Sequence, residues 1–190
     1  TGADFRADVA SIHERLTKQA IPVQLPIGVE SSFRGVVDLI TEKAYEWTDE
    51  LGQEYQEIPI PPEMAEDVRT ARHELIEAVV SHDEVLLERY LAGTTPSAEE
   101  IVRVLRAATI KFEIIPILCG TALKNKGVQL LLDAIVAYLP NPLDLPPVTG
   151  FDPKTKESVT RPATDDAPFT ALAFKVATDP FVGKLCYFRV

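Results

Sequence analysis

Two hydrophobic patterns meet in residues 113–139, the most informative part of the chain. Residues 114–119 form a short apolar run that predicts a strand buried on both faces. A small-residue turn at residues 120–127 leads into apolar positions at helical spacing, which Pro140 ends. This order predicts half of a parallel α/β unit, where ligands bind at the carboxyl ends of strands. The pattern leaves a ligand-binding turn and an ordinary connecting loop equally open. The helical positions are Val128, Leu131, Leu132, Ile135 and Leu139.

The first third of the chain predicts one helix followed by a small, mostly antiparallel sheet. Asp4 is a suitable N-cap for the helix. Residues 21–27 alternate in period two and contain prolines, which suits an edge strand. Further strands are expected at residues 36–40, 44–47 and 54–60. The apolar stripe of the helix consists of Phe5, Val9, Ile12 and Leu16.

Three helices are predicted after Pro61. The first has a long apolar face opposite an acidic one. The second covers residues 83–91 and ends at Gly93. The third begins with a capping box of Ser97 and Glu100. The apolar face of the first helix is Met64, Val68, Ala71, Leu75 and Val79, and that of the third is Ile101, Leu105, Ala108 and Phe112.

The region after residue 139 has a different character. Four prolines make residues 139–148 a stiff exit, and the polar residues 150–168 predict a linker or surface loop. Residues 169–190 predict a hairpin that begins a separate β domain. The chain starts without Met and stops inside an apolar run, so we expect it to be a piece of a longer protein.

The net charge of −10 arises entirely from one segment. Residues 19–112 carry eighteen acidic against eight basic side chains, whereas the remaining parts are balanced. Phosphate contacts need Lys and Arg, so this segment is not expected to bind nucleic acid directly. An acidic surface of this kind suits a basic protein partner or simple solubility, and both explanations remain open.

Several classes of protein are excluded by what the sequence lacks. No run of about 18 apolar residues is present, and the first residues do not resemble a signal peptide, so no membrane association is expected. Cys119 and Cys186 are expected to be free thiols, and the three histidines show no metal-ligand spacing. The sequence has no Gly-rich phosphate loop and no Gly-x-Ser-x-Gly or His-Glu-x-x-His motif. No catalytic residue and no metal site is therefore predicted.

Residues 119–129 resemble the guanine-contacting Ser-Ala-x-Lys turn of translational GTPases, and the likeness is closest to the bacterial elongation factor G family. The resemblance runs in order through essentially the whole chain. It is carried further by residues 24–28, 35–40, 90–91, 138–144, 171–175 and 178–185.

The resemblance implies an α/β fold that is part of a P-loop GTPase layer. Residues 1–18 and 113–140 match the C-terminal part of the GTPase domain, and residues 19–112 match an inserted acidic α/β subdomain. Residues 141–168 are then an exit and linker, and residues 169–190 are the first strands of a β-barrel domain II.

Guanine contacts are implied for four residues of the turn. Thr121 and Ala122 are expected at the base, with Leu123 and Lys124 flanking it. Small residues let backbone N–H groups approach the purine, and donors aimed at the guanine oxygen disfavour adenine, which has an amino group there. The family more often has Ser where Thr121 stands, but the hydroxyl is kept.

The family's Asn-Lys-x-Asp motif, phosphate loop, switch regions and catalytic His would lie upstream of Thr1. GTP or GDP with magnesium therefore belongs to the longer protein, and this fragment is expected neither to bind nor to hydrolyse GTP appreciably. The longer protein would be a cytoplasmic GTPase that moves tRNA and mRNA on the ribosome. A release-factor or ribosomal-protection GTPase is the alternative within the family, and a stalk-docking interaction module is the alternative outside enzymes.

The ribosomal stalk protein is the implied partner of the inserted subdomain. The family's insert contacts the C-terminal domain of that protein. The expected contact surface here is the polar face of the helix from Pro62 to Ser81. Its carboxylates are Glu63, Glu66, Glu74 and Glu77.

Overall fold

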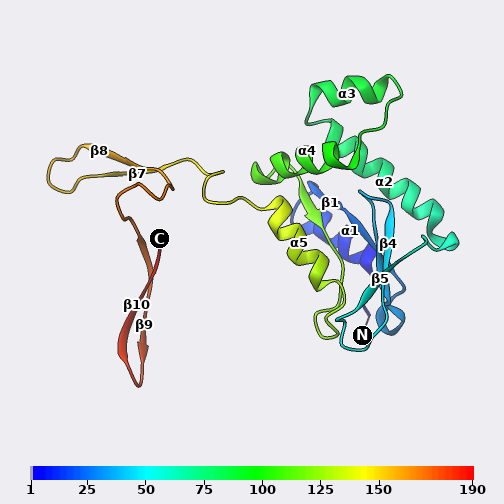
Figure 1. Cartoon of the computed structure of the whole chain (residues 1–190), viewed down its shortest axis with the longest axis horizontal. Helices are drawn as coiled ribbons and strands as arrows, with labels where there is room; N and C mark the ends of the chain where they lie inside the picture. The colour runs from blue at the N-terminus through cyan, green and yellow to red at the C-terminus, as the bar shows by residue number, and fades with distance from the viewer. Residues whose placement is uncertain (1) are drawn as a thin grey trace. The chain divides into compact units, whose positions relative to one another are not determined.

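The computed structural model describes residues 2–190, which belong to two compact units (Figure 1). One unit ends at Leu139 and contains all the helices of the described residues. The other runs from Pro140 to Val190 and contains only strands and loops within that description. The mixed α/β class predicted from the sequence is therefore confirmed.

The strand predicted at residues 21–27 is two strands in two different sheets. β1 (Ala20–Pro22) pairs in parallel with β6 (Ile115–Ile117), whereas β2 (Gln24–Ile27) pairs antiparallel with β3 (Gly35–Asp38). The change of partner falls at Val23, which hydrogen-bonds to both sheets. Its N–H donates to the Ile117 carbonyl at 2.9 Å, and its carbonyl accepts from the Leu39 N–H at 3.0 Å. Period-two alternation continues through Val23, so the sequence pattern gives no sign of the change.

The small antiparallel sheet is confirmed. Its order is β2-β3-β4-β5, with β4 at Lys43–Trp47 and β5 at Tyr55–Ile58. Each neighbouring pair is antiparallel, and the strand predicted at residues 36–40 ends at Asp38, so Leu39 and Ile40 belong to the connection between β3 and β4. A short 3₁₀ helix (Glu30–Ser32) lies in the connection between β2 and β3.

Three of the helices begin at side-chain caps, and the caps at Asp4 and Ser97 were predicted from the sequence. Asp4 accepts a hydrogen bond from the Ala7 N–H at 3.1 Å and starts α1 (Phe5–Arg15). Proline opens the next helical region, a 3₁₀ turn (Pro62–Met64) that runs into α2 (Ala65–Val80). Asp83 accepts from the Leu86 N–H and caps α3 (Glu84–Leu91). Ser97 and Glu100 form the expected capping box of α4 (Ala98–Ile110).

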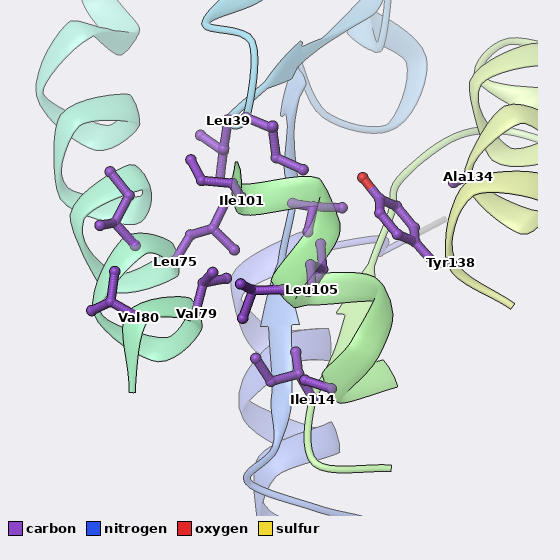
Figure 2. Packing of buried hydrophobic residues seen from close by; sticks show 14 of the residues in the cluster. Leu39, Leu75, Val79, Val80, Ile101, Leu105, Ile114, Ala134 and Tyr138 are labelled. Atoms are coloured by element: carbon purple, nitrogen blue, oxygen red, sulfur yellow. The ribbon is translucent and has the colours of Figure 1, made fainter. Parts of the chain in front are cut away.

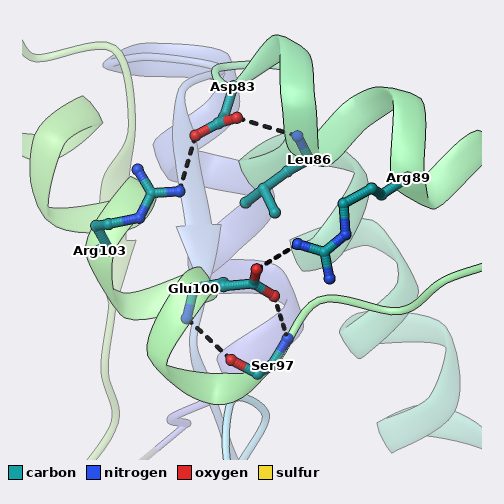
Figure 3. Close-up of polar contacts among 6 residues, drawn as sticks. All are labelled: Asp83, Leu86, Arg89, Ser97, Glu100 and Arg103. Carbon is teal, nitrogen blue, oxygen red and sulfur yellow. Dashed lines mark hydrogen bonds and ion pairs between the residues drawn. The ribbon is translucent and has the colours of Figure 1, made fainter.

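Ion pairs join α3 to α4 around these caps (Figure 3). Arg103 on α4 contacts the Asp83 carboxylate at 2.8 Å, and Arg89 on α3 contacts Glu100. Asp83 and Glu100, which cap the N-termini of α3 and α4, thus each also pair with an arginine of the neighbouring helix. Leu86 is the buried side chain of α3, and Leu87 and Tyr90 are partly buried against the core.

The hydrophobic core lies between α2, α4 and the antiparallel sheet (Figure 2). Leu75 and Val79 of α2 face Ile101 and Leu105 of α4, and Leu39 reaches the same cluster from the end of β3. α5 (Val128–Tyr138) adds Ala134 and Tyr138 from the other side of α4. These positions follow the predicted apolar faces of the first and third helices after Pro61, because only one face of each helix can be removed from water.

Some positions predicted as buried are exposed. β6 is only partly covered, with Ile115 38% exposed, so it is not buried on both faces. The described residues give β6 a single neighbour, β1, and its other edge has no strand partner there. Other apolar positions of the predicted stripes are exposed for the same reason, that no described element covers them. They are Leu16, Phe112, Leu131, Leu132, Ile135 and Leu139.

The second unit consists of two hairpins. The predicted linker contains the first of them, in which β7 (Val148–Phe151) pairs with β8 (Ser158–Arg161). Asp152 stabilises the turn between them by accepting from the Lys154 and Thr155 N–H groups, a local Asx turn that polar composition alone does not reveal. The predicted C-terminal hairpin is confirmed as β9 (Leu172–Asp179) and β10 (Gly183–Arg189). Within the described residues each hairpin is a separate two-stranded sheet.

Candidate functional site

The turn that follows β6 is a closed, hairpin-like arch. Thr121 and Lys126 form an antiparallel bridge, in which each backbone N–H donates to the carbonyl of the other residue. The nitrogen-to-oxygen distances are 2.9 and 3.2 Å. The Asn125 N–H donates to the Ala122 carbonyl at 3.1 Å and closes the tip. The arch therefore has a fixed shape from its own backbone, directly before α5 and at the carboxyl end of a parallel strand.

Gly127 is required where the arch meets α5. It has φ +92°, in the left-handed region that side chains other than glycine rarely adopt. A Cβ at this position would also lie 2.9 Å from the Cys119 carbonyl oxygen. The small residues in the sequence thus let the two ends of the arch approach each other.

The structure brings the four predicted guanine-binding residues together on this arch. Thr121 is half-buried at its base, and Ala122, Leu123 and Lys124 are exposed along its tip, with Leu123 96% exposed. Among the described residues, none accepts a hydrogen bond from the N–H groups of Ala122, Leu123 and Lys124. The tip therefore offers backbone donors in an accessible position.

Contacts from the antiparallel sheet support the arch, and the sequence pattern did not indicate them. The side-chain amides of Asn125 and Gln129 donate to the Gly52 carbonyl at 3.3 and 2.6 Å. The Trp47 indole N–H donates to the Gln129 amide oxygen at 3.3 Å. More than seventy residues separate the partners, as in the 77-residue step from Gly52 to Gln129, so no local spacing could reveal the pairing.

Cys119, at the start of the arch, is not an activated nucleophile. Burial raises the pKa of its thiol to about 12, because the thiolate would lose its hydration. A reactive cysteine has a lowered pKa instead.

The four predicted partner-binding carboxylates lie exposed on the 3₁₀ turn and α2. Glu66 pairs with Arg69, which balances part of the negative charge locally, and Glu77 lies 3.4 Å from the His73 imidazole. Glu63 and Glu74 have no ion-pair partner among the described residues. The structure thus presents an acidic but partly compensated surface at the predicted place.

Neither a metal site nor a membrane span is found in the part of the chain that the structure describes. Within residues 2–190, no three His, Cys, Asp or Glu side chains gather closely enough to hold an ion. No helix in the same range combines the length and apolar character needed to cross a bilayer.

Comparison with solved structures identifies a relative of similar architecture. No family model matches the chain. A protein from Thermus thermophilus, known from a crystal structure, is similar with a TM-score of 0.75 and 28% sequence identity. The match covers 99% of this chain and 25% of that chain, so this chain spans a quarter of the length of the solved relative. The mixed α/β arrangement described above therefore recurs in a larger protein.

Proposed function

We propose that the chain is part of a translational GTPase of the elongation factor G type, a cytoplasmic enzyme that moves tRNA and mRNA on the ribosome. In this proposal Thr121, Ala122, Leu123 and Lys124 contact the guanine base. One observation carries it: the arch after β6 is closed by its own hydrogen bonds and exposes three N–H groups that have no acceptor among residues 2–190, at the carboxyl end of a parallel strand. A release-factor or ribosomal-protection GTPase is the alternative within the same class.

The chemistry of the arch suits guanine. The base has an oxygen acceptor where adenine has an amino donor. Backbone N–H groups fixed at the tip of the arch can donate to the guanine oxygen. With adenine the same N–H groups would face the amino group, which is also a donor. A site built on such donors rejects the wrong base strongly, because the unmatched groups lose their water without gaining a partner.

The remaining parts of a nucleotide site are not provided by these residues. Phosphoryl transfer depends on groups that hold phosphates and Mg²⁺. The described residues contain no ligand cluster for a metal, and the sequence contains no phosphate loop. In this proposal the chain contacts only the base of GTP or GDP, and the longer protein would supply the contacts to phosphate and magnesium.

Calorimetric titration with four diphosphates tests this assignment. The 190-residue chain alone should give no measurable GDP binding. In the longer protein that contains the chain, GDP should bind, ADP should not, and the 2-aminopurine nucleotide should bind at least about a hundredfold more weakly than GDP, since it lacks the oxygen that the arch would contact. The inosine nucleotide, which keeps that oxygen, serves as the matched control.

Two results would contradict the proposal. Equal binding of GDP and the 2-aminopurine nucleotide would show that the arch does not recognise the base. Micromolar or tighter GDP binding by the 190-residue chain alone would show that the base contact does not depend on missing parts.

The acidic surface on α2 suggests a second role, as a docking site. We propose that Glu63, Glu66, Glu74 and Glu77 contact the C-terminal domain of the ribosomal stalk protein. The exposure of all four carboxylates supports this, and so does the concentration of negative charge in residues 19–112. Such a module would need no nucleotide, so the two roles are compatible in one protein.

A further inference from the structure

The turn between β4 and β5 lies directly against the arch. Gly52 is buried there, and its carbonyl accepts the hydrogen bonds of both Asn125 and Gln129. Asn125 belongs to the arch and Gln129 to the first turn of α5. One carbonyl of the β4–β5 turn therefore holds two points of the chain just after Ala122, Leu123 and Lys124.

The two backbones are too close for any residue other than glycine at position 52. A Cβ there would lie 2.3 Å from the Lys124 carbonyl oxygen and 2.7 Å from the Asn125 carbonyl oxygen. Both are backbone atoms of the arch, so a larger residue can be accommodated only if the arch moves. Gly52 also has φ +65°, which glycine adopts readily.

Gln129 connects this contact to the core of the sheet. Its amide oxygen accepts from the Trp47 indole, and Trp47 is only 3% exposed. The β4–β5 turn itself is held by the Asp49 carboxylate, which accepts from the N–H groups of Leu51, Gln53 and Glu54 at 3.0–3.1 Å. These hydrogen bonds, first those from the Glu54 and Gln53 N–H groups, lower the pKa of Asp49 because they stabilise the carboxylate. The supporting side is thus more rigid than a free loop.

We infer that Gly52 and Gln129 are positioning residues, which fix the shape of the arch and couple it to the four-stranded sheet. The inference rests on the proposed function, since it assigns the coupling to a base-recognition turn. Any partner that shifts the sheet then changes the affinity for the base. By thermodynamic linkage, base binding changes the affinity for that partner by the same factor.

Two substitutions in the 190-residue chain test the contact without nucleotide. Gln129→Leu removes the amide that bridges Gly52 and Trp47 at similar volume, and Gly52→Ala places a methyl group against the arch. Both should shift the NMR signals of the Ala122–Lys126 amides and accelerate the hydrogen exchange of the hydrogen-bonded Thr121, Asn125 and Lys126 amides about threefold to tenfold, the effect of losing one hydrogen bond. The exchange of α4 amides should be unchanged, which distinguishes local positioning from general destabilisation.

Gly93→Ala is the matched control. Gly93 also has a positive φ, of +90°, but a Cβ there meets nothing within 4 Å. This variant also places a side chain at a positive φ, and it should leave the arch amides unchanged. If Gln129→Leu and Gly52→Ala leave them unchanged as well, the positioning role is wrong. If the hydrogen-exchange rates of the α4 amides and the arch amides change by the same factor in these variants, the contact is only structural. The inference is then also overturned.

Nucleotide binding by the longer protein separates this inference from the proposed function. If the arch selects guanine, Gln129→Leu should weaken GDP binding about tenfold and leave the binding of a stalk domain to the α2 surface measurable. Unchanged GDP binding in this variant would overturn the positioning role while the proposed function stands. If the arch amides respond as expected but the longer protein does not select guanine, the proposed function is overturned instead.

Discussion

Two weakly acidic side chains, Cys119 and Tyr138, are expected to make the stability of this chain depend on pH. Burial raises the pKa of the Cys119 thiol from 9.0 to about 12. Burial, and to a smaller degree the negative charge of Asp38, raises the pKa of the Tyr138 hydroxyl from 10.0 to about 12. Both side chains are neutral in the folded protein at pH values where the unfolded chain would already ionise them.

We therefore predict that the protein loses stability in alkali. Because the folded-state pKa values are higher than the unfolded ones, the stabilisation is complete below about pH 9 and decreases as the pH rises towards about 12. Thermal unfolding measured across that window should show a falling midpoint, and Cys119→Ala and Tyr138→Phe should each make the decrease shallower. Cys186→Ala, which changes an exposed thiol, is the control and should leave the slope as it is. An identical slope in all variants would contradict the assignment.

Single residues also show what the sequence could and could not predict. Asp4, Ser97 and Glu100 were predictable because a cap contacts backbone groups only a few residues away. The pairing of Gly52 with Gln129 was not, because it depends on the fold bringing distant segments together. The arch residues 121–124 were predictable as a group, since they are consecutive in the chain.

At the scale of elements, the helices were easier to predict than the strands. The faces of α2 and α4 follow a period that repeats over several turns, so their buried sides are defined by many residues at once. β1 and β2 are three and four residues long and continue one alternation, so the partner of each depends on contacts made elsewhere. The exposure of Ile135 on α5 has the same origin, because periodicity indicates an apolar face but not whether another element covers it.

The acidic side of α2 allows a charge test of the docking proposal. Reversing Glu66 and Glu77 to Lys should weaken binding of the stalk protein's C-terminal domain about tenfold, and raising the salt concentration should weaken it further. The exposed ion pairs of these residues contribute little to stability, so the fold should be retained. Fluorescence or calorimetric titration of the 190-residue chain provides the measurement.

A double reversal on α3, Glu84→Lys with Glu88→Lys, is the matched control. It changes the net charge by the same amount on another exposed helix. If both double variants weaken binding equally, only the overall charge matters. If neither does, the surface on α2 is not the docking site.

At the scale of the whole molecule, the two units differ in how much apolar surface they bury. The buried cluster is drawn entirely from residues of the first unit. The hairpins of the second unit leave large apolar side chains exposed within the described structure, including Phe174, Val176 and Phe188. The end of the first unit is held from within, because Arg106 donates to the carbonyls of Ala137 and Leu139.

We predict that a chain ending at Leu139 folds on its own. Its thermal unfolding should remain cooperative, with a midpoint within about 5 °C of that of the 190-residue chain, because the buried cluster is complete without residues 140–190. Calorimetry of the two chains makes the comparison. A shortened chain that unfolds gradually or aggregates would show that the first unit needs the second.

The hydrogen bonds of Val23 have a consequence for how such a protein could have evolved. Its N–H donates to the parallel pair and its carbonyl accepts from the antiparallel sheet. This single residue therefore contributes a hydrogen bond to both sheets. A segment gained or lost by recombination between β1 and β6 must therefore join after this residue. A junction one strand earlier would remove β1 and leave β6 without its neighbour. Natural length variants of this fold, if they lack the four-stranded sheet, should accordingly retain β1 and place their junction at or after the position of Val23.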